Sequence, residues 1–333
     1  MKKKKIEDFV KDRNNSKFLF TAGPSSLVAE NISGLAPCFG RNDQQYLKVE
    51  EKVLKKLKKI SGHNKIVSMQ GSGSLALEIV SLNFLYGKVL IVSTGYYSDR
   101  LFNLCIKAKK NFNKITKVSK ISWKNLDDFS TRYDWVWACP TETSCGLKIP
   151  ITELKKFSKK IKAKLALDAT ASMGLEPFHE LGDVISYSSC KGLFGLTGGC
   201  FISYNINPEN KVNSFYLDIN SHIEKKMTGS YHSIQSLEKI LDRHKDFVYS
   251  VKINKKKFLK IFEDKLVYSN KNQPLICTYA NCKIGSKDKR VIFYKPRINL
   301  TGSVLCHLGE AHLGKSAKGE ILRKIYIDKK ERS

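Results

Sequence analysis

The 333-residue sequence predicts an α/β protein with a mostly parallel central sheet and, towards its C-terminal end, a smaller α+β part. Two observations carry this prediction. Between residues 65 and 188, short apolar runs alternate with stretches of helical apolar spacing, which is typical of strand–helix–strand units. From about residue 235, a long lysine-rich helical stretch and then short strands follow, which indicates a second unit.

The length suits one large domain and one small domain. We expect a flexible basic N-terminus at residues 1–17, a large domain at 18–240 and a small α+β domain at 241–333. In the large domain, strands are predicted at 65–70, 88–93, 135–139, 163–168 and 184–188, and helices at 75–86, 99–109 and 151–161. In the small domain, we predict a helix at 234–262, strands at 275–279 and 291–294, and a last helix near the C-terminus.

The net charge of +28, from 59 basic and 31 acidic side chains, has two interpretations. It can attract a polyanion such as RNA, or it can reflect a lysine-rich composition without a functional role. The lysines are spread over many predicted helices, and arginine, which is better suited to base recognition, is scarce beside lysine. We therefore do not expect nucleic-acid binding, and a polyanion-binding protein stays open as an alternative.

Three further features limit the class of protein. No apolar run approaches the ~20 residues of a membrane span, and the basic N-terminus lacks the apolar segment of a secretory signal. The nine cysteines include no CxxC pair, so neither a disulfide framework nor a zinc cluster is expected. His307 and His312 are five residues apart, which does not place two metal ligands on one helical face. We expect a cytoplasmic protein with free thiols and no metal site.

Polar and glycine-rich segments follow the predicted strands, where parallel sheets bind their ligands. The strand at 65–70 is followed by GSGS at 71–74, which leads into a helix. Glycines allow a close approach of the backbone, and a helix N-terminus offers free N–H groups to an anion. This segment therefore predicts a phosphate cradle, although a simple helix cap gives the same pattern.

Two further strand ends carry groups that can contact a flat ligand. Tyr97 follows the strand at 88–93, and an aromatic ring at such a place can stack on another ring. Thr143 lies in the hydroxyl-rich segment TETSCG after the strand at 135–139. Each of these residues taken singly is equally well explained as part of the core or of an ordinary loop.

Asp168 and Lys191 give the strongest chemical signal. Asp168 ends an apolar strand, where a carboxylate is costly unless it is paired, for example with a protonated pyridine nitrogen or as a helix cap. Lys191 follows the strand at 184–188 between small residues and before the glycine-rich GLFGLTGG. A lysine in such surroundings can become a nucleophile. The order of these strand ends is the one expected of a pyridoxal enzyme.

Together, these segments resemble a known family. FTAGPSSL, MQGSGSLALE, STGYYSDR, TETSCG, DATASMG, SSCKG and PRINLTGS, which cover most of residues 18–305, are similar to class V aminotransferases. Among these, the 2-aminoethylphosphonate–pyruvate transaminases look most similar. The resemblance implies the aspartate-aminotransferase-like fold (PLP fold type I) and pyridoxal 5′-phosphate (PLP) as cofactor.

The resemblance also implies roles on the cofactor side of the site. Lys191 would form a Schiff base with the cofactor and move the substrate proton. Tyr97 would stack on the cofactor ring, Thr143 would hydrogen-bond the cofactor, and Asp168 would pair with the pyridinium nitrogen. The phosphate would be held by Ser72, Gly73 and Ser74, with Cys190 where relatives carry Asn or Gln.

Further implied roles concern the substrate and the assembly. Arg297 would bind the carboxylate of pyruvate or alanine, with Gly23 and Arg41 as further substrate-side candidates. Tyr231 and Ser233 would reach the cofactor phosphate of a second subunit, which implies a homodimer with active sites shared across the interface.

The expected reaction is a ping-pong transfer of an amino group between 2-aminoethylphosphonate and pyruvate, in either direction, as part of phosphonate metabolism. A class V transaminase that uses serine or alanine with glyoxylate is the first alternative. The altered turn after Lys191, Asn299 after the Arg-Ile pair and the short C-terminal domain are departures from the family pattern that fall mainly on the substrate side. A non-catalytic polyanion-binding protein on the same fold is the second alternative.

Overall fold

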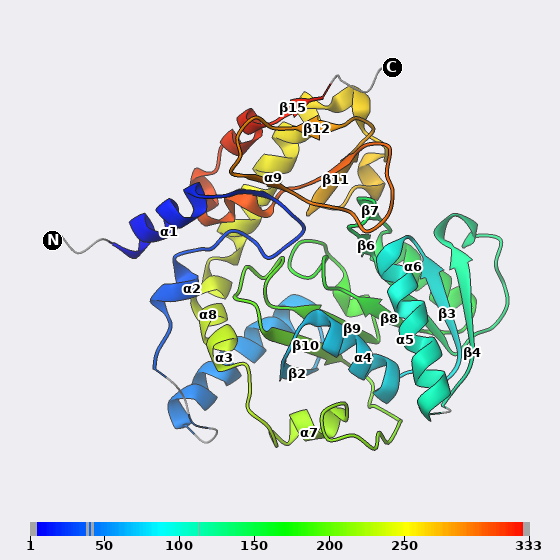
Figure 1. Cartoon of the computed structure of the whole chain (residues 1–333). Coiled ribbons are helices and arrows are strands. Elements are labelled where there is room, and N and C mark those ends of the chain that lie inside the picture. The colour runs from blue at the N-terminus through cyan, green and yellow to red at the C-terminus, as the bar shows by residue number, and fades with distance from the viewer. Residues whose placement is uncertain (1–4, 38–39, 41–42, 113, 329–333) are drawn as a thin grey trace.

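The computed structural model describes residues 5–37, 40, 43–112 and 114–328, and its centre is a seven-stranded sheet (Figure 1). The strands are β2 (Lys65–Gln70), β3 (Gly87–Ser93), β4 (Ile115–Ser122), β5 (Trp135–Ala138), β8 (Lys164–Asp168), β9 (Val184–Ser188) and β10 (Gly199–Tyr204), in the order β2-β10-β9-β8-β5-β3-β4. β10 is antiparallel to both of its neighbours, and the other neighbouring pairs are parallel. Six strands therefore end at the same edge.

Helices cover both faces of this sheet, as the alternating pattern predicts. In β3, Val89 and Ile91 face a core shared with two helices, whereas Leu90 and Val92 face the core on the opposite side. The first core contains α4 (Gly73–Asn83) and α5 (Tyr96–Phe112), and the second contains α3 (Gln44–Ser61), α6 (Ile151–Lys160) and α8 (Tyr231–Asp242). The α/β fold class with a mostly parallel sheet is thus confirmed.

The predicted strands of the large sheet are confirmed within one residue at either end, whereas the helix bounds are less accurate. The helix expected at 75–86 is α4, which starts at Gly73 and ends at Asn83, because the chain turns into β3 at Gly87, a residue with positive φ. The helix expected at 99–109 is longer at both ends in α5. β4 and β10 were not predicted. β4 is an edge strand rich in lysine and serine, and β10 follows a glycine-rich turn.

The C-terminal part, in orange and red above the sheet in Figure 1, contains small sheets packed on α9 (His244–Ile261). The single helix predicted at 234–262 is wrong, because non-helical backbone at Arg243 separates α8 from α9. The predicted last helix is replaced by two 3-10 segments, Leu308–Ser316 and Glu320–Lys324, the first of which is interrupted by a non-helical Gly314. The strands are β11 (Cys277–Ala280), β12 (Ile284–Gly285), β13 (Val291–Phe293), β14 (Ser303–Cys306) and β15 (Tyr326–Ile327).

The N-terminal segment contacts this C-terminal part. Strand β1 (Phe18–Phe20) pairs in parallel with β13, and Phe20 is buried in the C-terminal core. Before it, Ile6–Asn15 form helix α1, in which Val10 is buried. The division at residues 17 and 240 stays a prediction. Within the described residues, every helix is too short or too polar to span a bilayer.

Candidate active site

A cavity of about 260 Å³ opens at the edge where the parallel strands end. Its walls come from the turns after β2, β5, β8 and β9 and from the first turns of α5. Because these strands are parallel, segments far apart in sequence meet here. The cavity brings together Ser72, Gly73, Ser74, Tyr97, Thr143, Asp168, Cys190, Lys191 and Arg297.

Lys191 lies three residues after the end of β9 and is half-buried. Its Nζ is 5.8 Å from the centroid of the Tyr97 ring. Gly23 has φ of +134°, and a Cβ at this position would lie 2.9 Å from Cγ of Lys191. A glycine is therefore required where the N-terminal loop passes the lysine stem. Cys190 is also half-buried, with its Sγ 3.9 Å from the Ser188 hydroxyl.

Asp168 ends β8 with a side chain that is 2% exposed. Its Oδ1 accepts the backbone N–H of Thr170 at 3.0 Å, and its Oδ2 forms an ion pair with Nη2 of Arg100 at 3.2 Å. The carboxylate is therefore paired within the chain, as its burial requires. Arg100 was not predicted as a site residue.

The glycine-serine turn lies at the N-terminus of α4. Ser72 is the N-cap residue, yet its hydroxyl makes no capping hydrogen bond, which leaves it available to a ligand. A Cβ on Gly73 would lie 3.1 Å from the Thr170 hydroxyl, so the turn packs closely on the loop after β8. Since the first N–H groups of a helix have no intrahelical acceptors, this turn has the donors of an anion site.

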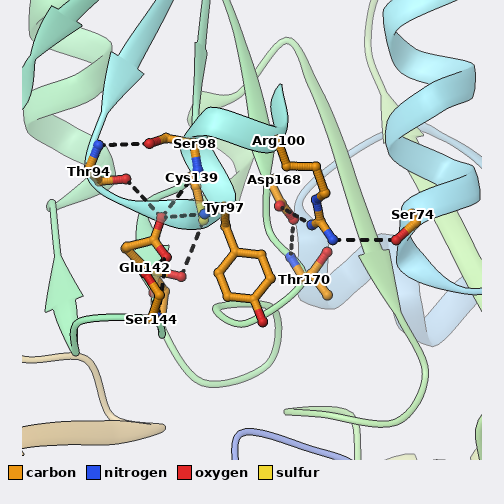
Figure 2. A network of polar contacts seen from close by, with 11 residues as sticks. Ser74, Thr94, Tyr97, Ser98, Arg100, Cys139, Glu142, Ser144, Asp168 and Thr170 are labelled. Atoms are coloured by element: carbon orange, nitrogen blue, oxygen red, sulfur yellow. Dashed lines mark hydrogen bonds and ion pairs between the residues drawn. The ribbon is translucent and has the colours of Figure 1, made fainter. Parts of the chain in front are cut away.

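Glu142 is fully buried and joins two loops of the cavity (Figure 2). Its carboxylate accepts the backbone N–H groups of Tyr97 at 3.0 Å and Ser98 at 3.2 Å, at the start of α5. It also accepts from the hydroxyls of Thr94 and Ser144. Burial raises the pKa of Glu142, and the hydrogen bonds, led by the one from Ser144, oppose this shift. Glu142 was not predicted as a site residue, although it lies within TETSCG.

Several hydroxyls face the cavity. The Thr141 and Thr170 hydroxyls are buried and have no hydrogen-bond partner among the described residues. Buried polar groups are usually paired, so such hydroxyls are suited to bind a polar ligand. Burial, followed by the nearby Tyr97 hydroxyl, raises the pKa of the Tyr294 phenol, and the Thr143 hydroxyl opposes that shift. The predicted Thr143 therefore stands in a cluster of hydroxyls.

Cys139 is a buried thiol in the cavity wall. Burial, then the charges of Asp168 and Glu142, raise its pKa well above the ordinary value. The thiolate is the nucleophilic form of cysteine, so this thiol is kept in its unreactive state. Cys139 is therefore not the expected nucleophile of this cavity.

Arg297 lies at the rim with an exposed side chain, and its Nη1 donates to the Tyr96 hydroxyl at 2.9 Å. The guanidinium also lies over the Tyr96 ring, 5.2 Å from its centroid. The planar fork of Arg297 keeps further donors for a carboxylate. Arg41, the other basic substrate-side candidate, lies outside the described residues.

Tyr231 and Ser233 lie at the start of α8. The Tyr231 ring packs on Tyr46 of α3, with centroids 4.5 Å apart, next to a second cavity of about 270 Å³. The Ser233 hydroxyl donates to the carbonyl of Thr197 at 2.7 Å, and Thr197 lines the first cavity. Their predicted role towards a second subunit stays a prediction.

No protein-family model matches the chain. In sequence, it is 27% identical over 176 residues to a 2-aminoethylphosphonate–pyruvate transaminase of Pseudomonas putida (strain W619), covering 49% of this chain and 47% of that protein. A protein of the same name from another P. putida strain is 24% identical over 260 residues, 70% of each chain. The chain thus spans about half the length of several curated relatives that it matches.

Solved structures show the fold. An alanine–glyoxylate aminotransferase from Nostoc superimposes with a TM-score of 0.74 at 16% identity, covering 92% of this chain and 95% of that one. A PLP-bound phosphoserine aminotransferase from Trichomonas vaginalis gives a TM-score of 0.71 at 15% identity, covering 92% and 99%. The chain therefore has the aspartate-aminotransferase-like fold.

Proposed function

We propose that the protein is a PLP-dependent aminotransferase. The observation that carries the proposal is the meeting of Lys191, Asp168 and Tyr97 in one cavity at the carboxyl edge of the sheet. An amine, a buried carboxylate and an aromatic ring are the three groups that a pyridoxal cofactor needs, one for attachment, one for its ring nitrogen and one for its ring face. The similarity to named aminotransferases supports the same reaction class.

The residues of the cavity fit this cofactor. The turn at Ser72, Gly73 and Ser74 would hold the phosphate, because it combines free helix N–H groups with hydroxyls. The unpartnered hydroxyls of Thr141 and Thr170 would supply further hydrogen bonds. When bound, PLP supplies an electron sink that stabilises negative charge on the substrate carbon.

The chain's own residues would perform the remaining steps. The Nζ atom of Lys191 would remove a proton from the substrate carbon and return it to the cofactor side, since it stands over the Tyr97 ring. Glu142 would hold that ring in place through the backbone of α5. Arg297 would orient the substrate by its carboxylate at the rim.

For the substrates, we propose 2-aminoethylphosphonate and pyruvate, giving phosphonoacetaldehyde and alanine. The names of the relatives in sequence support this pair. The main alternative is a serine or alanine donor with glyoxylate, and an alanine–glyoxylate aminotransferase is among the proteins that share the fold. A polyanion-binding protein is less well supported, because it does not require Lys191 and Asp168 in the same cavity.

We also propose that two copies of the chain form a homodimer. In this assembly, Tyr231 and Ser233 of one copy would reach the cofactor phosphate of the other. The turn at Thr197, which the Ser233 hydroxyl contacts, lies between the cavity and the start of α8, so this surface is close to the cavity.

A donor screen tests the proposed function. The protein, loaded with PLP, is mixed with one amino donor at a time, and its visible absorption band is followed through a single half-reaction. We expect 2-aminoethylphosphonate to remove the band and pyruvate to restore it. Loss of the band with serine or alanine, but not with 2-aminoethylphosphonate, would establish the alternative substrates. A colourless protein that takes up no PLP and binds RNA would contradict the aminotransferase proposal.

A further inference from the structure

Arg100 is placed in the cavity by the same helix turn that carries Tyr97. The two residues are three positions apart on α5, so their side chains lie on one face. The guanidinium carbon of Arg100 is 5.0 Å from the centroid of the Tyr97 ring. The ring that would carry the cofactor therefore also orients this guanidinium.

The Arg100 side chain spans two parts of the wall, as Figure 2 shows. Its Nη1 is 3.4 Å from the hydroxyl of Ser74, and its Nη2 is 3.2 Å from Oδ2 of Asp168. The guanidinium thus joins the glycine-serine turn to the end of β8. A lysine could not make both contacts, because its charge is a single point and not a planar fork.

These contacts leave part of the hydrogen-bonding capacity of Arg100 unsatisfied. Its Nε is buried and has no hydrogen-bond partner among the described residues. The contact with Ser74 is long for a hydrogen bond, whereas the Asp168 side chain, on the other side, is 2% exposed and firmly fixed. The guanidinium therefore has N–H groups left for a further acceptor.

Three cationic side chains line the described cavity, namely Arg100, Lys191 and Arg297. Arg297 donates to Tyr96 at the rim, and Lys191 stands over the Tyr97 ring. Arg100 is the one of the three that contacts the serine turn. An anion at this turn would therefore meet Arg100 as its nearest positive side chain.

We propose that Arg100 is a binding residue for the anion held at the glycine-serine turn, namely the cofactor phosphate, while it keeps its ion pair with Asp168. The identity of the anion rests on the proposed function. In this arrangement one guanidinium bridges the phosphate end of the cavity and the carboxylate that would meet the ring nitrogen. Its planar fork fixes the distance between these two anchors.

The test compares three probes: PLP, pyridoxal without the phosphate, and inorganic phosphate. Each is titrated into the wild type, Arg100→Gln, Arg100→Lys and the control Arg132→Gln, which changes an exposed arginine. Binding of PLP and pyridoxal is followed by absorbance, and binding of inorganic phosphate by the shift in thermal unfolding. Circular dichroism establishes that each variant is folded.

We expect Arg100→Gln to weaken the binding of PLP and of inorganic phosphate by about 10- to 100-fold, which is the range expected for the loss of a hydrogen bond to a charged group. Binding of pyridoxal to Arg100→Gln should weaken by less than about threefold. Binding of every probe to Arg132→Gln should change by no more than that. Arg100→Lys keeps the charge without the planar fork, so we expect an intermediate loss of affinity. If Arg100→Gln does not fold, the Arg100→Lys variant provides the test.

The inference is overturned if Arg100→Gln binds PLP as well as the wild type does. Tighter binding would also overturn it, because Arg100 would then compete with the cofactor ring nitrogen for Asp168. An equal loss of PLP and pyridoxal would also overturn it, since the effect would not depend on the phosphate. If the wild type takes up no PLP but binds inorganic phosphate through Arg100, the anion site stands and the proposed function fails. If the wild type takes up PLP and the Arg100 variants bind it equally well, the proposed function stands and the role of Arg100 fails.

Discussion

The buried carboxylate of Glu142 accepts the backbone N–H of Tyr97 at 3.0 Å, and so ties the short strand β6 (Thr141–Glu142), which follows β5, to the first turn of α5. A negative charge at this position is stabilised by the free N–H groups and the dipole of the helix. The contact matters for the site because the ring of Tyr97 and the guanidinium of Arg100 both depend on where α5 begins.

We expect Glu142→Gln to loosen this arrangement. Glutamine has one acceptor oxygen, and its amide donates, so it cannot accept all the N–H and O–H groups that now point at the carboxylate. Unfolding by urea should show a loss of about 1–3 kcal/mol, and PLP should be released faster. The control Glu263→Gln changes an exposed carboxylate and should leave both quantities unchanged. Unaltered stability and PLP retention in Glu142→Gln would refute this positioning role.

Asp168→Asn removes the charge at the end of β8. The variant leaves the Arg100 guanidinium without its carboxylate partner and would weaken the hold on the cofactor ring nitrogen. Steady-state kinetics should show kcat/KM reduced by about 10- to 100-fold. Asp128→Asn, at an exposed site, should behave as the wild type. Normal turnover in Asp168→Asn would show that the carboxylate has no part in the reaction.

The site residues that the strand pattern itself identified are those that follow easily recognised strands, and the others came from the family resemblance. Asp168 and Lys191 end or follow apolar runs that become β8 and β9, so the rule for parallel sheets places them at one edge. The fold class was predictable for the same reason. The edge strand β4 was missed because its lysines and serines hide the alternation of a strand with one exposed face.

Glu142 and Arg100 were missed for a different reason, since their roles depend on contacts between segments far apart in the sequence. Glu142 is 45 positions from Tyr97, and no local pattern indicates that its carboxylate meets the start of α5. Arg100 is 68 positions from Asp168. Arg100 lies in the quoted segment STGYYSDR and near the start of the helix predicted at 99–109. Its spacing of three from Tyr97 becomes informative only once α5 is known to begin at Tyr96 and the cavity is known.

Substitution of Arg297 should affect substrate binding more than cofactor binding. Arg297→Lys keeps the charge but loses the bidentate fork, so KM for pyruvate should rise by roughly tenfold, and Arg297→Gln should raise it by roughly 100-fold. The visible spectrum of the loaded protein should not change, because Arg297 is exposed at the rim. An unchanged KM in both variants would remove Arg297 from the substrate site.

Acid should destabilise the fold through buried histidines. Burial, followed by the charge of Lys255, lowers the pKa of His307 to about 3, below its ordinary value of 6.5. The folded state thus favours the neutral imidazole, and this contribution is complete above 6.5 and is lost as the pH falls towards 3. Burial lowers the pKa of His179 to about 4, with the same sign.

Thermal unfolding should therefore shift to lower temperature as the pH is lowered from about 7 to about 4. His307→Gln should make this dependence less steep, because a glutamine does not take up a proton. His232→Gln changes an exposed histidine and should keep the wild-type dependence. A wild-type protein that gains stability in acid, or a His307→Gln variant as sensitive as the wild type, would contradict this account.

Covalent attachment of the cofactor to Lys191 can be measured directly. The protein is incubated with PLP and reduced with borohydride, and its intact mass and peptide map are measured for the wild type and Lys191→Ala. We expect one reduced cofactor per wild-type chain, located on Lys191, and none on Lys191→Ala. A wild-type protein without this adduct, or an adduct that persists in Lys191→Ala, would contradict this expectation.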